Sequence, residues 1–227
     1  MFGFYNNKRR VSYRNRDERN VAAASVIQNL VGDKGTILNI GSGGEEFLKG
    51  AMPEAYIFDV DITGKADLLV DLETIKTFDC PDGAYEIVVA LDLLEHIENF
   101  HAMLEEMFRC AEKYVLVSLP NPTASFINIF RNRQRSNGQA YQRGIYEKFY
   151  GLPLEKPIDR HKWFFSIDDV RALFDHYLKQ QKITGVEYFS AHSWSLTRIL
   201  IRAFLGRRLY YNFFLPNIWI LATVKKS

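Results

Sequence analysis

The stretch Thr36-Ile37-Leu38-Asn39-Ile40-Gly41-Ser42-Gly43-Gly44-Glu45-Glu46-Phe47 decides the fold. A short apolar run, typical of a buried strand, leads into a glycine-rich turn that is expected to open into a helix near Gly44. Glycine lacks the Cβ that would hold a ligand away from the main chain, so such a turn lets a ligand lie against bare peptide groups. We therefore expect a strand–turn–helix unit with a binding pocket at the turn.

The composition is that of an ordinary globular protein. Of the 227 residues, 47% are hydrophobic and 25% are charged, which suits one α/β domain with a sizeable core. Cys80 and Cys110 are too few for a disulfide framework, so reduced thiols are expected. The N-terminus lacks the apolar core of a signal peptide, and the late apolar run 213–224 is too short to span a bilayer. These features predict a soluble, cytoplasmic protein.

The net charge of +2 hides an uneven distribution. Acidic residues crowd between Glu45 and Glu112, whereas the segments 115–142 and 188–227 contain none. Three parts of the chain are basic, namely these two segments and the N-terminus: Lys8, Arg9, Arg10, Arg14, Arg16, Arg131, Arg133, Arg135, Arg198, Arg202, Arg207, Arg208, Lys225 and Lys226. Such a distribution says more about binding partners than the net charge does.

Strand and helix patterns alternate along the chain. Strands are expected at 36–40, 55–61, 67–71, 85–91, 114–119, 183–189 and 217–224, and helices at 19–31, from 44, at 99–109 and after Ser166. For the last helix, Ser166 and Asp169 are expected to form a capping box, with Phe165 and Val170 as a hydrophobic staple. The alternation predicts an α/β fold with a mostly parallel sheet covered on both faces, in which ligands bind beyond the carboxyl ends of the strands.

The glycine turn fits neither of two common phosphate-binding motifs. The dinucleotide fingerprint requires a third glycine where this chain has Glu46, and a P-loop requires a lysine followed by Ser or Thr. Glu45 and Glu46 would also oppose a pyrophosphate at the start of the helix. A ligand with a cationic centre suits this local acidity better.

Four motifs follow one another at suitable spacing, at 37–44, 58–62, 71–72 and 84–97. In this order they resemble the class I S-adenosylmethionine-dependent methyltransferases of the small-molecule type, over residues 21–122. The resemblance implies a Rossmann-like seven-stranded sheet whose last strand is antiparallel, with S-adenosyl-L-methionine as cofactor. It also implies a single domain over 1–227, with a core at 20–122 and 166–227, an acceptor-side insertion at 123–165 and a basic N-terminal segment at 1–18.

The resemblance assigns cofactor-binding roles to residues of these motifs. Gly41, Ser42 and Gly43 are expected to line the methionine part of the cofactor. Asp61 is expected to accept hydrogen bonds from the ribose hydroxyls, Asp71 to lie near the adenine amino group, and Leu91 or Asp92 to lie near the edge of the cofactor. Ile62 and Leu72 are also expected to bind the cofactor. Asp59 competes with Asp61 for the ribose. An ionised carboxylate suits that role because it accepts hydrogen bonds from two neighbouring hydroxyls. The chain departs from the family pattern at Asn39, where an acid is common, and at Gly44-Glu45.

Simpler structural roles remain open for the same residues. Asp59, Asp61 and Asp71 could merely end strands, and the glycines could form only a tight turn. The pattern of Asp92 and Glu95 could cap a helix.

Methyl transfer needs a general base only if the acceptor must lose a proton. His96 is the first candidate, because an unperturbed imidazole titrates near neutrality. His161 is the second, although the cluster 159–163 could equally be a surface turn with a buried Trp163. We predict no metal site.

The family builds its acceptor pocket from the N-terminal segment, the region after strand five and the segment between the last two strands. In this chain those three segments are the basic ones. This predicts an anionic acceptor, either a small molecule or a glycan or lipid precursor, with nucleic acid ranked last. The basic, amphipathic segment 196–211 could instead rest on an anionic membrane, or the charges could only solubilise the surface.

Two other function classes compete with a methyltransferase. A non-catalytic module could bind S-adenosylmethionine and use its basic segments to engage a partner or a membrane. A nicotinamide-dependent oxidoreductase is disfavoured by Glu46.

Overall fold

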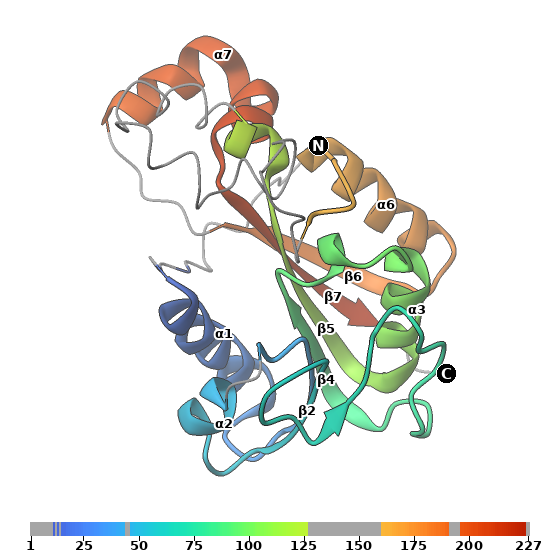
Figure 1. The fold of residues 1–227 in the computed structure, drawn as a ribbon. Helices are drawn as coiled ribbons and strands as arrows, with labels where there is room; N and C mark the ends of the chain where they lie inside the picture. Colours follow the sequence, from blue (N-terminus) through green and yellow to red (C-terminus); the bar gives the residue numbers. More distant parts are fainter. Residues whose placement is uncertain are drawn as a thin grey trace, which may run out of the picture.

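A single seven-stranded sheet forms the centre of the protein (Figure 1). The computed structural model describes residues 11, 13, 15–43, 46–126, 160–190 and 196–225. The strands, in the spatial order β3-β2-β1-β4-β5-β7-β6, are β1 (Thr36–Ile40), β2 (Tyr56–Asp61), β3 (Leu68–Leu69), β4 (Tyr85–Leu91), β5 (Ala111–Pro120), β6 (Ile183–Phe189) and β7 (Asn217–Val224). Most of the predicted insertion and of the N-terminal segment lies outside the described residues.

The directions of the strands confirm the predicted fold class. Strands β1 to β5 pair in parallel, whereas β7 runs antiparallel to both β5 and β6. The sheet is therefore mostly parallel with an antiparallel last strand. In such a sheet the carboxyl ends of β1, β2 and β4 lie side by side at one edge, which is where ligands bind.

Helices cover both faces of the sheet (Figure 1). On one face lie α1 (Arg16–Val31) and α2 (Phe47–Ala51), and on the other lie α3 (Phe100–Cys110) and α6 (Ile167–Lys179). The short 3-10 helix η1 (Leu94–His96) follows β4, and α7 (Leu196–Phe214) extends beyond the sheet. Of the helices in the described part of the chain, none is long and apolar enough to cross a membrane.

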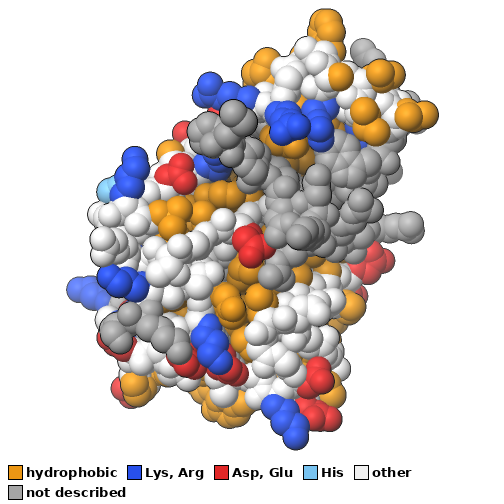
Figure 2. Space-filling view, turned by 180° about the vertical axis from the view of Figure 1, so that it is seen from behind, with side chains coloured by type: hydrophobic (Ala, Val, Ile, Leu, Met, Phe, Trp, Pro, Cys, Tyr) orange, Lys and Arg blue, Asp and Glu red, His pale blue; other side chains and the backbone are white. Residues whose placement is uncertain are grey.

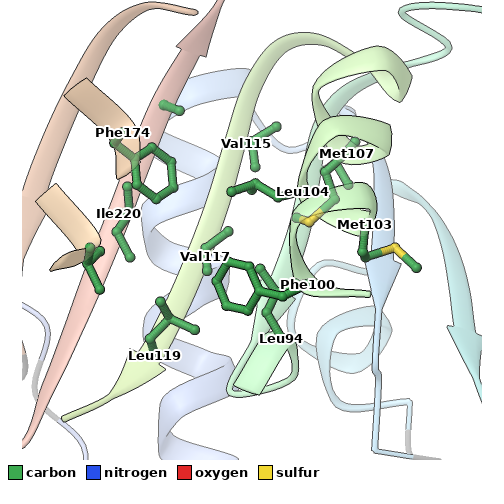
Figure 3. Close-up of a cluster of buried hydrophobic side chains, with 14 of the residues drawn as sticks. Leu94, Phe100, Met103, Leu104, Met107, Val115, Val117, Leu119, Phe174 and Ile220 are labelled. Atoms are coloured by element: carbon green, nitrogen blue, oxygen red, sulfur yellow. The ribbon is translucent and has the colours of Figure 1, made fainter. Parts of the chain in front are cut away.

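Alternate residues of the central strands face opposite layers, as the two-residue period of a strand requires. Val115 and Val117 of β5 belong to the core beneath α3 and α6, whereas Leu116 faces α1. Figure 3 shows the first core, where Phe100 and Leu104 of α3 meet Val117. Residues 87–91 of β4 are all buried, as predicted for a strand covered on both faces.

Several boundaries differ from the sequence-based prediction. β5 begins at Ala111 rather than 114, and β3 has only two residues. The helix after the glycine turn begins at Phe47. The capping box is confirmed, because the Ser166 hydroxyl accepts from the Asp169 N–H while the Asp169 carboxylate accepts from the Ser166 N–H.

Candidate active site

The glycine turn is held in a conformation that favours glycine at two positions. Gly41 and Gly43 have φ angles of 74° and 79°, a region in which side chains with a Cβ are strained. A Cβ on Gly41 would also lie 2.8 Å from a methyl carbon of Leu93. The Gly41 N–H donates to the Val60 carbonyl at 2.8 Å, which ties the turn to the end of β2.

Asp61 ends β2 and organises the turn beside it. Its carboxylate accepts three backbone hydrogen bonds, from Gly43 at 2.7 Å, Ile62 at 2.8 Å and Thr63 at 3.2 Å. A carboxylate has about four lone-pair sites, so about one remains for an incoming hydroxyl. The side chain is buried but for 7% of its surface. Asp61 therefore shapes the turn and keeps limited capacity to accept a hydrogen bond from a ribose hydroxyl, and its binding of the ribose stays a prediction.

Asp59, the competing choice for the ribose, has structural partners on both carboxylate oxygens. One oxygen accepts from the Asn39 amide at 2.7 Å, and the other lies 3.2 Å from the Lys49 ammonium. Burial raises the pKa of Asp59, against the effect of Asn39 and Lys49. Asn39, which replaces the acid common in the family, is thus the neutral partner of a buried carboxylate. These contacts favour Asp61 over Asp59 as the ribose ligand.

The predicted adenine-side residues lie at the surface after β3. The Asp71 carboxylate is exposed and accepts from the Glu73 N–H at 3.0 Å, which forms a local turn. Leu72 is buried in the core, whereas Ile62 is 62% exposed. Their contact with adenine stays a prediction.

Asp92 has a role that its sequence pattern does not reveal. Its carboxylate forms an ion pair with Arg19 of α1 and accepts from the Ser118 hydroxyl at 2.6 Å. Its φ angle of 50° places it in the left-handed region. The reading of Asp92 and Glu95 as a helix cap is wrong, because η1 starts after Leu93 without any side-chain cap. Asp92 instead joins α1 to the carboxyl ends of β4 and β5.

The pocket residues fit the cofactor that the resemblance implies. The Ser42 hydroxyl is buried and, within the described residues, forms no hydrogen bond. A buried hydroxyl without a partner is unfavourable, and a polar ligand at the turn would remove that penalty. Together with the glycine backbone and Asp61, Ser42 would hold the methionine and ribose parts.

Two histidines lie together where the loop after β4 meets the segment before α6. His96 ends η1, and its ring lies 4.4 Å from that of His161, measured between centroids, at an interplanar angle of 76°. His96 Nε2 lies 3.6 Å from a carboxylate oxygen of Glu95, which is buried. The structure thus brings together both predicted general bases and adds an acid that was not predicted as a site residue.

The segment that carries His161 is fixed against the loop after β4. The Lys162 N–H donates to the Glu95 carbonyl at 2.7 Å, and the Trp163 indole donates to the Ile97 carbonyl at 2.7 Å. Lys162 also forms an ion pair with Glu73. Trp163 is half-buried, so this cluster is more than a surface turn.

Sequence reasoning missed three residues at this edge of the sheet. Arg19 and Ser118 bind Asp92 across 73 and 26 positions of the chain, and no local pattern announces such contacts. Glu95 lies between Asp92 and His96 in the motif at 84–97. Its burial, which points to a role beyond a helix cap, is visible only in the structure.

The comparisons with known proteins agree with this geometry. The model of a methyltransferase domain family matches residues 8–177, which is more than half of the chain. A comparison with curated proteins gives no match. A non-catalytic binding module gains no support from these findings.

Solved structures with the same fold include several methyltransferases. A SAM-dependent methyltransferase from Archaeoglobus fulgidus is 17% identical, with a TM-score of 0.57, and covers 93% of this chain and 96% of its own. A SAM-dependent methyltransferase from Methanosarcina mazei is 14% identical, with a TM-score of 0.53 and coverages of 89% and 98%. A putative methyltransferase from Bacillus halodurans is 12% identical, with a TM-score of 0.51 and coverages of 92% and 100%. Sequence motifs, fold and family model converge, and the chain belongs to the class I S-adenosylmethionine-dependent methyltransferases.

Proposed function

We propose that this enzyme methylates an anionic acceptor, either a small molecule or a glycan or lipid precursor. The observation that carries the proposal is the position of the acid-free, arginine-rich helix α7. Its C-terminal end is attached to Asn121, directly after β5, whose amide donates to the carbonyls of Asn212 at 2.9 Å and Leu215 at 2.8 Å. The helix therefore ends beside the carboxyl end of β5, at the side of the sheet where ligands bind.

Four arginines supply the positive charge of α7. Arg198, Arg202 and Arg207 have no acidic residue within their own helix, because 188–227 contains none. The Arg208 guanidinium forms an ion pair at 2.6 Å with Asp168 of α6. A positive surface near the pocket favours approach of anionic molecules and raises their local concentration.

The protein's part in the reaction is mainly alignment. The cofactor would supply a methyl group on a sulfonium: an acceptor atom would bond to the methyl carbon in line as the carbon–sulfur bond breaks, and the neutral thioether S-adenosylhomocysteine would leave. Orienting two reactants in this way accounts for a large share of such rate enhancements. The glycine turn and Asp61 would fix the cofactor end, and α7 would position the anionic end of the acceptor. His96 or His161 would take the proton of an acceptor hydroxyl or amine.

A second proposal concerns where the acceptor is found. Along the first half of α7 an apolar stripe faces solvent, with Leu196, Leu200 and Phe204 exposed by 81%, 69% and 90%. Figure 2 shows hydrophobic side chains over this end of the molecule, with Lys and Arg side chains beside them. A basic helix with an exposed apolar stripe suits peripheral binding to an anionic membrane. A lipid precursor would be met on that surface.

Methyl transfer to fractionated extract tests the acceptor class. Wild type and labelled S-adenosylmethionine are incubated with source-cell extract separated on an anion-exchange column. Label is expected in retained, anionic fractions, and its rate of incorporation should fall as salt rises from about 0.05 M to about 0.5 M, since salt screens exposed charges. Label confined to the unretained fractions, or a rate that does not respond to salt, would contradict an anionic acceptor.

A further inference from the structure

Three metal-binding side chains converge where the loop after β4 meets the segment before α6. Glu95, His96 and His161 each offer one ligand atom, and these atoms all lie within 4.8 Å of one another. Glu95 is 1% exposed, and both histidines are half-buried. None of the three belongs to the set predicted to bind the cofactor.

We propose that Glu95, His96 and His161 bind one divalent transition-metal ion of the zinc type. Two imidazole nitrogens and one carboxylate oxygen form a donor set that zinc uses in catalytic sites, with further positions left for a ligand. Magnesium fits less well, because it prefers oxygen ligands alone. The proposal departs from the sequence-based expectation of no metal site, since the two histidines are far apart in the chain and only the fold joins them.

The distances are close to those of a formed site. With metal–ligand bonds of about 2.0–2.2 Å, tetrahedral ligand atoms lie about 3.4 Å apart. His96 Nε2 and Glu95 Oε1 are already 3.6 Å apart. The other ligand atoms lie within 4.8 Å of one another, so no pair has to approach by more than about 1.4 Å to reach the tetrahedral spacing.

Hydrogen bonds and ring packing hold the segment of His161 against the loop that carries Glu95 and His96. Hydrogen bonds from Lys162 to the Glu95 carbonyl and from the Trp163 indole to the Ile97 carbonyl, both 2.7 Å, flank His161 on its C-terminal side. Packing of Trp163 against Phe100, with ring centroids 5.8 Å apart, adds a third restraint. Such support lowers the reorganisation needed to bind an ion.

A metal here would also explain how an anionic acceptor is held, and this step rests on the proposed function. A divalent ion carries two positive charges, and Glu95 neutralises one of them. The remaining charge and the remaining coordination positions suit a phosphate or carboxylate oxygen of the acceptor. Histidines that bind the ion cannot serve as general base, so the metal and base assignments exclude one another.

Metal titration of the full chain tests the proposal without any activity assay. After chelator treatment, wild type is titrated with Zn²⁺ against a chromogenic chelator, and separately with Co²⁺ by visible absorption. One equivalent is expected to bind. His96→Ala and His161→Ala should each weaken binding at least about 100-fold, because changes in mere supporting residues already cost about 10–100-fold. His176→Ala, which alters an exposed histidine of α6, should bind like wild type.

Two results would overturn the metal site. One is wild type that binds Zn²⁺ no more tightly than the His96→Ala/His161→Ala double variant. The other is a loss of Zn²⁺ affinity in His176→Ala that equals the loss in His96→Ala and His161→Ala. Binding of S-adenosylhomocysteine is measured on the same preparations. Retained binding in the variants shows that they are folded, whereas its absence from wild type would contradict the methyltransferase assignment and leave the metal result standing.

Discussion

At the residue scale, Asp92 is the side chain with the most structural consequences. It bonds both Arg19, whose side chain is 11% exposed, and the fully buried hydroxyl of Ser118. A buried charge that loses its partner is strongly unfavourable, because desolvation is no longer offset. Asp92 therefore stabilises the attachment of α1 to the sheet, whatever it contributes to the cofactor.

Replacing Asp92 should cost stability even though the residue is partly exposed. Asp92→Asn keeps the shape and tolerates the left-handed backbone, but it removes the charge that pairs with Arg19. We expect a loss of about 2 kcal/mol in the free energy of unfolding, below the range for fully buried pairs. Urea denaturation measures it. Asp79→Asn, which alters an exposed aspartate, should change the free energy of unfolding by no more than about 0.5 kcal/mol. An equally small change in Asp92→Asn would contradict the role of Asp92 in attaching α1 to the sheet.

At the element scale, one ion pair fastens α3 to the loop before β4. Glu106 accepts from the Phe78 N–H at 2.7 Å and pairs with Arg109 through both of its oxygens, at 2.6 Å and 2.8 Å. Arg109 in turn donates to the carbonyls of Phe78 and Cys80. The pair thus supplies donors and acceptors for a loop that has no regular secondary structure.

This pair makes stability depend on pH. Although burial raises the pKa of Glu106, hydrogen bonds from Arg109 and Phe78 lower it below its ordinary value of 4.5. A lowered pKa gives stability that is present above about pH 4.5 and is lost as the pH falls through the folded value. Glu106→Gln should cost about 2 kcal/mol at pH 7 and less at pH 4.

Urea unfolding of both proteins at the two pH values checks this dependence. Glu105→Gln is the control, because that residue sits one position earlier and forms only an exposed pair with Lys182. An equal loss at pH 7 and pH 4 for Glu106→Gln would show that the charge is not responsible.

Local patterns predicted the elements better than their ends. The capping box at Ser166 and the strand at 36–40 are set by neighbouring residues, and both are found as predicted. β5 begins three residues early, at Ala111, which pairs with Tyr85 of β4, and the register shifts before Tyr114 pairs with Ile87. Such pairing depends on the partner strand, which the local sequence does not contain.

The site was predictable where it lies next to a strand end, and not where the fold joins distant segments. Gly41 follows β1 and Asp61 ends β2, and the parallel pairing of these two strands brings the glycine turn and the carboxylate together. The contact of Arg19 with Asp92 and that of His96 with His161 join distant parts of the chain. No periodicity encodes these contacts, so only the three-dimensional structure reveals them.

At the scale of the whole molecule, α7 gives the protein one apolar, basic end. The helix bends at Gly206, whose φ angle is 76°, and only its second half contains fully buried residues. The first half projects its apolar stripe away from the core. Such an exposed stripe normally marks a contact surface rather than a solvated helix.

Vesicle sedimentation tests that contact. Wild type should sediment with vesicles that contain about 30% anionic phospholipid, and not with neutral ones, because apolar insertion and charge attraction act together. Leu200→Ser/Phe204→Ser should reduce the bound fraction about tenfold or more. Ile62→Ser, which alters an exposed apolar residue elsewhere, is the matched control. Equal binding to neutral vesicles, or an unchanged double variant, would exclude α7 as the anionic-membrane contact.

The central claim is that the turn at Gly41 and the carboxylate of Asp61 bind S-adenosylmethionine. Calorimetric titration with S-adenosylhomocysteine tests it most directly. Wild type should bind one equivalent, and Asp61→Ala should bind at least about 10-fold more weakly, since a hydrogen bond to a charged group is worth about 1.5–3 kcal/mol. Asp79→Ala should bind like wild type. Absence of binding by wild type would contradict the cofactor assignment, and undiminished binding by Asp61→Ala would contradict the role of Asp61.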